Sequence, residues 1–219
     1  MTRKLRYDIP GPDWRCDLEQ VATRGWGPIF GADLPVPFAL VVEIGFGRGE
    51  FLMDLARRDP KTAFVGVEVS FKRVLKMARR VAATPLRNLR LVQAPGEVVL
   101  AQGLSSRSVG TFWVNFPDPW PKKRHAKKRF VRPEVAALLA DRLVAGGTIE
   151  AATDDRAYAE QMDEVFSAEP LLENLHAPAH WLPEVTGRTQ TGYEQQWRAQ
   201  GRPMHFLSYR RRDGCGGPR

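Results

Sequence analysis

Residues 41–51 have the sequence VVEIGFGRGEF, in which a short apolar run leads into Gly45, Gly47 and Gly49. The apolar run fits a buried strand, and the residues that follow, 50–58, have the periodicity of a helix. Glycine allows the tight turn that such a junction needs and lets the backbone approach a ligand closely. A glycine loop is also compatible with a purely structural turn, so the residues around it have to decide between the two.

The alternation of strand and helix continues along the chain, which is typical of βαβ units and a mostly parallel sheet. The expected strands are 39–44, 63–69, 89–92, 111–115 and 148–152, with 171–175 and 204–209 as late additions. The expected helices are 50–58, 71–83, 97–101, 133–143 and 157–168. We therefore expect an α/β fold with a mostly parallel seven-stranded sheet and helices on both faces.

The two ends of the chain depart from this alternation. Residues 1–38 are rich in Pro, Gly, Trp and charge, which predicts an irregular N-terminal arm with a short helix at 17–23. Residues 39–212 form the predicted domain, because 219 residues suit one sizeable core better than two. The remaining residues, 213–219, predict a disordered tail.

The composition is basic, with 33 Lys and Arg against 25 Asp and Glu, a net charge of +8 and a pI near 9.9. Such a balance favours polyanionic partners such as nucleic acid. The sequence lacks an apolar run of the roughly 18 residues that a spanning helix needs, and its opening residues lack a signal-peptide core. Only Cys16 and Cys215 occur, without metal-ligand spacing. We expect a cytoplasmic protein that binds no membrane and no metal, with the oligomeric state open and a monomer favoured.

Acidic residues surround the glycine loop. Glu50 follows the last glycine and occupies the helix start where nucleotide-binding loops place phosphate. Glu43 precedes the loop, and Glu68 ends the second expected strand, where a carboxylate suits two ribose hydroxyls. S-adenosylmethionine has a ribose, no phosphate, and cationic groups that prefer acidic surroundings, so it fits all three positions. A solvated strand-end acid is the alternative for Glu68 alone.

A proline-rich loop follows the fourth expected strand, with Asp118 at its centre in FPDPWP, residues 116–121. Each proline pushes the residue before it into an extended conformation, which applies to Phe116, Asp118 and Trp120. Such a loop can hold one carboxylate in place at the carboxyl edge of the sheet. The alternative is a structural turn in which Trp120 plugs the core.

A cationic run begins at Lys122 and ends at Arg129, without an acidic residue. Runs of charge usually form a solvated face, but this one follows a candidate active-site loop in a basic chain. Cations of this kind contact the phosphates of a nucleic acid without selecting a sequence. We expect it to bind nucleic acid.

Two later polar groups complete the candidates. Asp154 ends the fifth expected strand in ATDDR, where Asp154 or Asp155 also suits a helix N-cap. Thr191 and Glu194 have the spacing of a capping box, which is the alternative to a binding role.

Taken together, the chain resembles the tRNA (guanine-N7)-methyltransferase family. The matching segments are EIGFGRGEF (43–51), FVGVEV (64–69), NLRLVQA (88–94), FPDPWPKKRHAKKR (116–129), ATDD (152–155) and TGYE (191–194). The resemblance implies a class I methyltransferase fold, S-adenosylmethionine as methyl donor, tRNA as partner, and methylation of N7 of a guanosine at position 46 in the variable loop.

The resemblance also implies roles for individual residues. The expected cofactor-binding residues are Glu43, Gly45, Gly47, Glu68, Glu97 and Asp118, and Asp118 is also the expected catalytic carboxylate. The expected substrate-binding residues are Lys122, Asp154, Thr191 and Glu194. The expected RNA-binding residues are Arg124, His125, Lys127, Lys128 and Arg129. The family commonly has an acid near the end of the third strand; this chain has Ala94, Pro95 and Gly96 there, so Glu97 or the backbone is left to contact the adenine edge.

The chemistry suits these roles. Guanine N7 carries a lone pair at neutral pH, so it needs alignment and charge stabilisation from Asp118 rather than a general base. Asp154 or Glu194 can accept from guanine N1–H and N2–H, Lys122 can reach O6, and Trp120 can help a swung-out base. Two other functions stay open: an RNA-binding protein without activity, and a nicotinamide-dependent reductase, which the Gly-x-Gly-x-Gly spacing disfavours.

Overall fold

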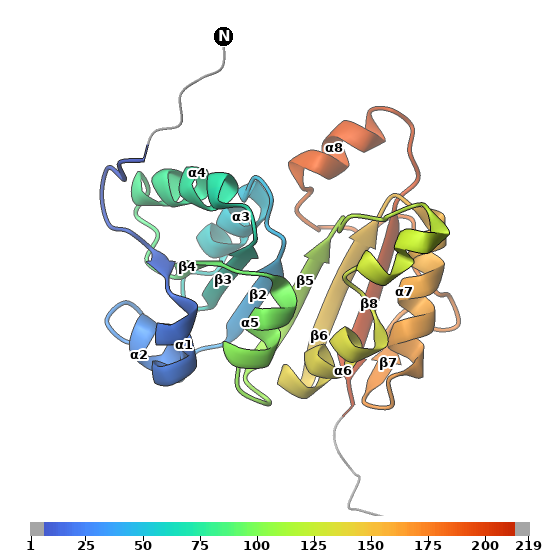
Figure 1. Ribbon diagram of the computed structural model, residues 1–219, viewed down its shortest axis with the longest axis horizontal. Helices are drawn as coiled ribbons and strands as arrows, with labels where there is room; N and C mark the ends of the chain where they lie inside the picture. Colours follow the sequence, from blue (N-terminus) through green and yellow to red (C-terminus); the bar gives the residue numbers. More distant parts are fainter. Residues whose placement is uncertain (1–6, 213–219) are drawn as a thin grey trace, which may run out of the picture. The chain divides into compact units, whose positions relative to one another are not determined.

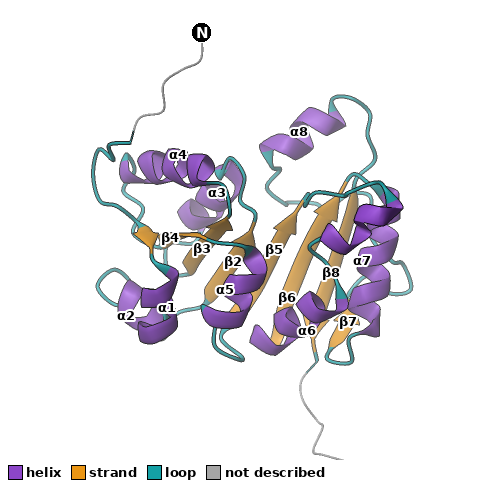
Figure 2. Ribbon diagram, viewed as in Figure 1, coloured by secondary structure: helices purple, strands orange, loops and turns teal. Residues whose placement is uncertain are grey.

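The computed structural model of the protein describes residues 7–212, apart from the side chains of Lys123 and Ala126. The chain divides into two compact units, Met1–Gly103 and Leu104–Arg219, which we call the first and second unit. Figures 1 and 2 show the elements of each unit. The tail predicted at 213–219 lies outside the described residues.

The first unit contains four parallel strands in the order β1-β4-β3-β2. They are β1 (Arg15–Cys16), β2 (Leu40–Ile44), β3 (Ala63–Glu68) and β4 (Leu89–Gln93). All six residues of β3 are buried. A parallel strand is buried along its whole length when helices cover both faces of the sheet, and this accounts for the continuous apolar run that predicted it.

From residue 7 onward, the helices of the first unit are α1 (Leu18–Arg24), α2 (Trp26–Phe30), α3 (Glu50–Arg58), α4 (Phe71–Ala82) and α5 (Gly96–Gln102). Helices α3 and α4 pack with β3 and β4 in one apolar cluster, to which Leu52, Phe64, Met77 and Leu91 belong. The predicted helices at 50–58, 71–83 and 97–101 are confirmed to within one residue at each end.

The N-terminal residues are more ordered than the sequence predicts. Where an irregular arm with one short helix was expected, the chain forms β1, α1 and α2. Trp26 Nε1 donates to the carbonyl of Gly103 over 2.9 Å, and the guanidinium of Arg90 lies 4.4 Å from the ring centroid of Trp14. These partners are distant in sequence, so no local pattern announces them. Strand β1 raises the number of described strands from the expected seven to eight.

The second unit contains strands in the order β5-β6-β8-β7. They are β5 (Val109–Asn115), β6 (Leu143–Thr153), β7 (Leu172–Asn174) and β8 (His205–Arg211). Strands β5 and β6 are parallel, whereas β8 is antiparallel to both of its neighbours. Strand β6 begins five residues before the expected start: Leu143 pairs with Val109, and a register shift between Val109 and Thr111 separates this pair from the ladder that begins at Thr148.

The helices of the second unit are η1 (Lys123–Lys128), a 3₁₀ helix, and α6 (Pro133–Arg142), α7 (Arg156–Ala168) and α8 (Gly192–Arg198). Helices α6 and α7 pack on β6 and on each other. The predicted α/β class with mostly parallel strands is confirmed. Within residues 7–212, no helix has the length and apolar character needed to cross a bilayer.

Candidate active site

The three glycines of the loop after β2 all have a left-handed backbone, with φ of 77° at Gly45, 56° at Gly47 and 76° at Gly49. Among the described residues, a Cβ at Gly45 would meet nothing within 4 Å, and one at Gly47 would meet only the carbonyl oxygen of Gly45, at 3.9 Å. A Cβ at Gly49 would lie 2.2 Å from Sδ of Met77. Gly45 and Gly47 therefore leave space for a ligand, whereas Gly49 is a packing requirement at the start of α3.

The carboxylate of Glu68 ties the end of β3 to this loop. Its Oε2 accepts from the backbone N–H of Gly47 at 3.2 Å, and its Oε1 accepts from that of Ser70 at 2.9 Å. Arg73 Nη1 lies 3.3 Å from Oε2. Glu68 is buried, yet a carboxylate has about four acceptor directions. Glu68 can therefore hold the loop and still accept from a hydroxyl.

Glu43 lies on the same face of the sheet as Glu68. It pairs in register with Gly66, and residues two apart on a strand share a face. Glu43 is also buried. The first unit thus brings two of the predicted cofactor-binding acids to one face of neighbouring strands, near the glycine loop.

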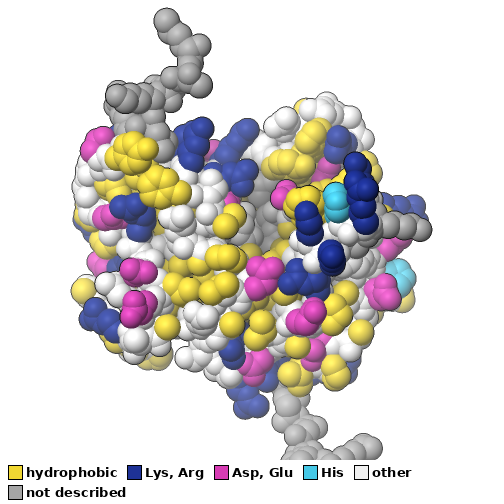
Figure 3. Space-filling view, viewed as in Figure 1, with side chains coloured by type: hydrophobic (Ala, Val, Ile, Leu, Met, Phe, Trp, Pro, Cys, Tyr) yellow, Lys and Arg dark blue, Asp and Glu magenta, His cyan; other side chains and the backbone are white. Residues whose placement is uncertain are grey.

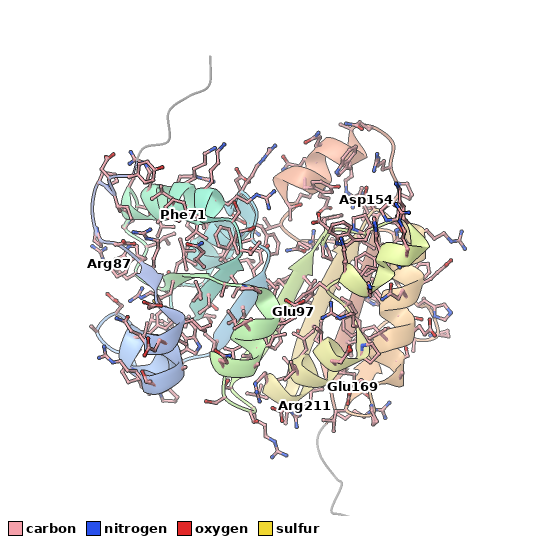
Figure 4. All side chains as sticks on the ribbon, viewed as in Figure 1. Phe71, Arg87, Glu97, Asp154, Glu169 and Arg211 are labelled. Carbon is pink, nitrogen blue, oxygen red and sulfur yellow. The ribbon has the colours of Figure 1, made fainter. Side chains whose placement is uncertain are left out.

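Two more side chains lie at the carboxyl ends of these strands. Glu97 is partly buried in the first turn of α5, just after β4 (Figure 4). Val69 follows Glu68 directly, and its side chain is 65% exposed, which gives an apolar surface next to the acid. Sequence reasoning missed Val69, although an apolar residue after a strand-end acid was the signal.

The loop around Asp118 differs from its predicted conformation. Phe116 and Trp120 have φ of 50° and 43°, so the prediction that they are extended was wrong. A left-handed non-glycine residue costs about 1–3 kcal/mol and persists only where surrounding contacts impose it. Here Phe116 N donates to Ala152 O over 2.8 Å, which keeps Phe116 on β6 and turns the chain sharply after it. Proline restricts the backbone of the residue before it, but the tertiary contacts of that residue determine which backbone conformation it adopts.

Arg129 holds the same loop from the other side. Its Nε donates to the carbonyl of Pro119 over 2.6 Å, its Nη1 donates to Gln161 Oε1, and its guanidinium lies 4.9 Å from the ring centroid of Tyr158. Arg129 is buried. Because its donors point into the protein, this arrangement argues against the RNA contact predicted for Arg129 and favours a positioning role.

The rest of the basic run is accessible. Lys122, Arg124, Lys127 and Lys128 are exposed and His125 is half-buried, and Figure 3 shows Lys and Arg side chains gathered on this part of the second unit. The ring of Trp120 packs against this segment: its centroid lies 4.7 Å from Lys128 Nζ and 5.7 Å from the ring of His125. Trp120 therefore supports the basic segment rather than plugging the core.

Asp118 is exposed. Like Asp154, it affects the pKa of Tyr193 through its charge. Burial raises the pKa of Tyr193, and the charges of Asp154 and Asp118 raise it further. The ring of Tyr193 also lies 5.2 Å from that of Phe116 and 5.3 Å from that of Trp197. The carboxylates that follow β5 and β6 thus both add negative charge to the surroundings of Tyr193. Sequence reasoning did not single out Tyr193, although TGYE contains it.

Asp154 and Asp155 have separate roles. Asp155 caps α7, because its Oδ1 accepts from Tyr158 N at 2.8 Å. The carboxylate of Asp154, at the end of β6 (Figure 4), accepts from Arg202 Nη1 at 2.7 Å. Arg202 in turn lies 3.7 Å from the ring centroid of Trp197. Asp154 is therefore not the cap, and it stays a candidate for substrate.

The alternative considered for Thr191, a helix cap, is present: its Oγ1 accepts from Glu194 N at 2.9 Å at the start of α8, and its predicted substrate contact stays a prediction. Glu194 is buried between two arginines: Arg198 Nε lies 3.0 Å from its Oε1, and Arg188 pairs with its Oε2. Arg188 also donates to Asn115 Oδ1 over 2.6 Å. Glu194 thus links α8 to the end of β5 through Arg188, a residue that no local pattern identifies.

Comparisons with known proteins identify relatives of this chain. A family model described as "Putative methyltransferase" matches residues 38–207. A tRNA (guanine-N(7)-)-methyltransferase of Leifsonia xyli is 37% identical over 221 residues, covering 96% of both chains. An enzyme of the same name from Halorhodospira halophila is 36% identical over 211 residues, covering 91% of both chains.

Solved structures show the same fold at low identity. The 16S rRNA methyltransferase KamB superposes with a TM-score of 0.61 at 16% identity, covering 86% of this chain and 93% of that one. A 16S rRNA adenine-N1 methyltransferase from Catenulisporales acidiphilia, solved with its cosubstrate SAM, has a TM-score of 0.61 at 17% identity, with 93% and 95% coverage. These structures show the fold alone, whereas the sequence relatives of high coverage establish that the chain belongs to the tRNA (guanine-N7)-methyltransferase family.

Proposed function

We propose that this protein methylates N7 of a guanosine in tRNA with S-adenosylmethionine as the donor, and that the target is position 46 in the variable loop. The main support is the similarity to two relatives that are named tRNA (guanine-N(7)-)-methyltransferase. The similarity extends over nearly the full length of both relatives. The location in the variable loop rests on the resemblance of the sequence motifs. Cytoplasmic location, a monomeric state and independence of metal stay predictions.

The residues of the first unit fit S-adenosylmethionine by their chemistry. Gly45 and Gly47 leave space beside the backbone, Glu68 has acceptor capacity for ribose hydroxyls, and Glu43 adds the negative charge that a cationic ligand prefers. We assign Val69 to the adenine face and Glu97 to its edge. The bound cofactor supplies an electrophilic methyl group on a sulfonium. Glu50 at the start of α3 disfavours a phosphate there.

We assign Asp118 to orientation and charge stabilisation. The N7 lone pair of guanine is available without removal of a proton, so the required help is alignment of the base and compensation of the positive charge that develops on the purine. A carboxylate fixed on a braced loop suits this task. Arg129 contributes as a positioning residue, since it bonds to the carbonyl that directly follows Asp118 in the chain.

Contacts within the second unit decide which carboxylate, Asp154 or Glu194, we assign to the recognition of guanine. Both oxygens of Glu194 are paired with arginines, so we assign the acceptance of N1–H and N2–H to Asp154. Lys122 is exposed beside the loop and is assigned to O6. For the swung-out base we assign Tyr193 rather than Trp120, because the ring of Trp120 is packed against Lys128 and His125.

The remaining cations of the basic segment are assigned to the RNA backbone. They are Arg124, His125, Lys127 and Lys128, of which only His125 is half-buried. Contacts of this kind hold an RNA without choosing its sequence. Selection of the guanosine then falls to the residues around Asp154.

The experiment is a methyl-transfer assay with two unmodified tRNA transcripts, one with the variable-loop guanosine and one with adenosine in its place. The expected result is one 7-methylguanosine per molecule in the first transcript and none in the second. Equal methylation of both transcripts would contradict the position, and absence of 7-methylguanosine from both would contradict the activity.

A further inference from the structure

Helix α4 presents a second cationic surface, far in sequence from the basic segment. Its sequence FKRVLKMARRVA contains five Lys or Arg and no acid. The buried side chains of the helix are Val74, Leu75, Met77, Ala78 and Val81, whereas Lys72, Arg73, Lys76 and Arg80 are exposed. Lys72, Lys76 and Arg80 follow one another at the helical spacing of four, and Arg73 lies three residues before Lys76, so the four side chains form one solvent-facing stripe.

The charges of this stripe are only partly neutralised. Arg73 lies 3.3 Å from the buried Glu68, and Arg80 lies 3.5 Å from Glu50 while donating to the carbonyl of Arg48 over 2.6 Å. Lys72 and Lys76 make no ion pair with any residue in the described part of the chain. On this helix face, Lys72 and Lys76 keep their full charge, and the charges of Arg73 and Arg80 are partly neutralised by one carboxylate each. Such a face attracts an anion with several charges.

Aromatic side chains lie at the start of the same helix. Phe71 is 41% exposed and Tyr7 is 68% exposed, with their ring centroids 6.2 Å apart. Figure 4 labels Phe71 on α4, and Figure 3 shows Lys and Arg side chains over this helix near apolar ones. Cations that follow a backbone, combined with exposed rings on which bases stack, are the means by which proteins bind single-stranded or looped nucleic acid.

We propose that the α4 surface, formed by Tyr7, Phe71, Lys72, Arg73, Lys76 and Arg80, binds the phosphate backbone of tRNA as a contact separate from residues 122–129. The inference rests on the proposed function, which supplies the RNA. The surface suits RNA better than a lipid bilayer. Its exposed aromatic part is the single ring pair of Tyr7 and Phe71, which is too small to insert into a bilayer. Helix α4 follows β3, so this surface adjoins the edge that carries Glu68 and the glycine loop.

The test measures the affinity of the full-length protein for a tRNA transcript at several salt concentrations. In the variant Lys72→Ala/Lys76→Ala, affinity should fall roughly tenfold and the slope of log affinity against log salt should shrink by about 2, because each lost phosphate contact removes about one unit. Phe71→Ala should weaken binding without changing the slope. A matched variant of the same unit, Arg57→Ala/Lys61→Ala, removes two exposed cations that do not belong to the α4 surface and should change neither quantity.

Thermal melting of each variant checks that the fold is retained. Unchanged affinity and slope in the Lys72/Lys76 variant, with 7-methylguanosine still formed by the wild type, would overturn this inference alone. A wild type that bound no tRNA would overturn the proposed function with it. If anionic phospholipid vesicles bound the wild type but not the variant, while tRNA affinity stayed the same, the surface would serve a membrane and the inference would fail.

Discussion

The glycine loop of the first unit and the Asp118 loop of the second both follow a parallel strand, but they reach their shapes in different ways. In the glycine loop, the left-handed conformations occur at Gly45, Gly47 and Gly49, where they cost little. In the Asp118 loop they occur at Phe116 and Trp120, where they are strained. The first loop is specified by its own sequence, and the second is imposed by its neighbours.

This difference agrees with the proposed tasks of the two loops. A loop that only has to let a ligand approach needs space and a backbone that tolerates it. A loop that has to aim one carboxylate at a reacting base needs rigidity, and here Arg129 and Ala152 supply it from outside the loop. The comparison predicts that variants of the second loop affect turnover, whereas variants around the first affect cofactor affinity or stability.

The largest effect is expected for Asp118→Ala. Methyl transfer should fall by about 10³-fold, the scale on which the loss of one charge-stabilising group acts. Because Asp118 is exposed and caps no helix, the melting temperature should stay within a few degrees of the wild type. Single-turnover rates and a thermal melt check this, and retained methylation would remove Asp118 from the reaction.

Arg129→Met should lower the transfer rate by up to about 10²-fold, since small displacements of a positioned group have effects of that size. If Arg129 braces the loop rather than touching RNA, the salt slope of tRNA binding should be unchanged. The matched variant Lys127→Ala/Lys128→Ala should do the reverse and lower the slope by about 2 with a smaller effect on the rate at saturation. A reduced slope in Arg129→Met would instead restore its predicted RNA contact.

Glu68→Gln tests the first loop. A hydrogen bond to a charged group contributes about 1.5–3 kcal/mol, so affinity for S-adenosylmethionine should fall by about tenfold or more while tRNA affinity stays the same. Calorimetric titration of cofactor into both proteins measures the difference. Equal cofactor affinities would mean that Glu68 serves only to hold the backbone of Gly47 and Ser70.

The smallest effects are expected for Gly49→Ala and Gly45→Ala, which should differ in stability and in cofactor affinity. Gly49→Ala should lower the free energy of unfolding by about 1–3 kcal/mol, because a new Cβ collides with Met77 in a strained backbone. Gly45→Ala meets open space, so it should cost only the backbone strain and should mainly weaken cofactor binding. Urea unfolding and cofactor titration of the two variants distinguish these outcomes. Equal destabilisation in both variants would contradict the conclusion that Gly49 is required for packing whereas Gly45 leaves space for a ligand.

Much of the fold was predictable because its signals are local. Glycine placement, apolar runs and helical period identified β2, α3 and β3 with nearly correct ends, and the acids Glu43 and Glu68 came to one face through the period of two along a strand. The N-terminal strand and helices were not predictable, because Arg90 and Gly103 hold them from a distance.

The candidate site was predicted in part for the same reason. Asp118 and Asp154 follow their strands as expected, and Thr191 caps its helix. The bracing by Arg129 and the burial of Glu194 between Arg188 and Arg198 depend on residues that meet only after folding. The composition of the basic run is visible in the sequence, but nothing local shows that its last member turns inward.

The most direct test of the account is the solvent isotope effect on single-turnover methyl transfer at saturating tRNA and cofactor, measured in H2O and D2O. If Asp118 orients and stabilises without removing a proton, the two rates should be nearly equal for the wild type, and Asp118→Asn should be slow by the same factor in both solvents. A wild-type rate that is clearly slower in D2O, with the difference abolished in Asp118→Asn, would show that the carboxylate removes a proton and would contradict the account.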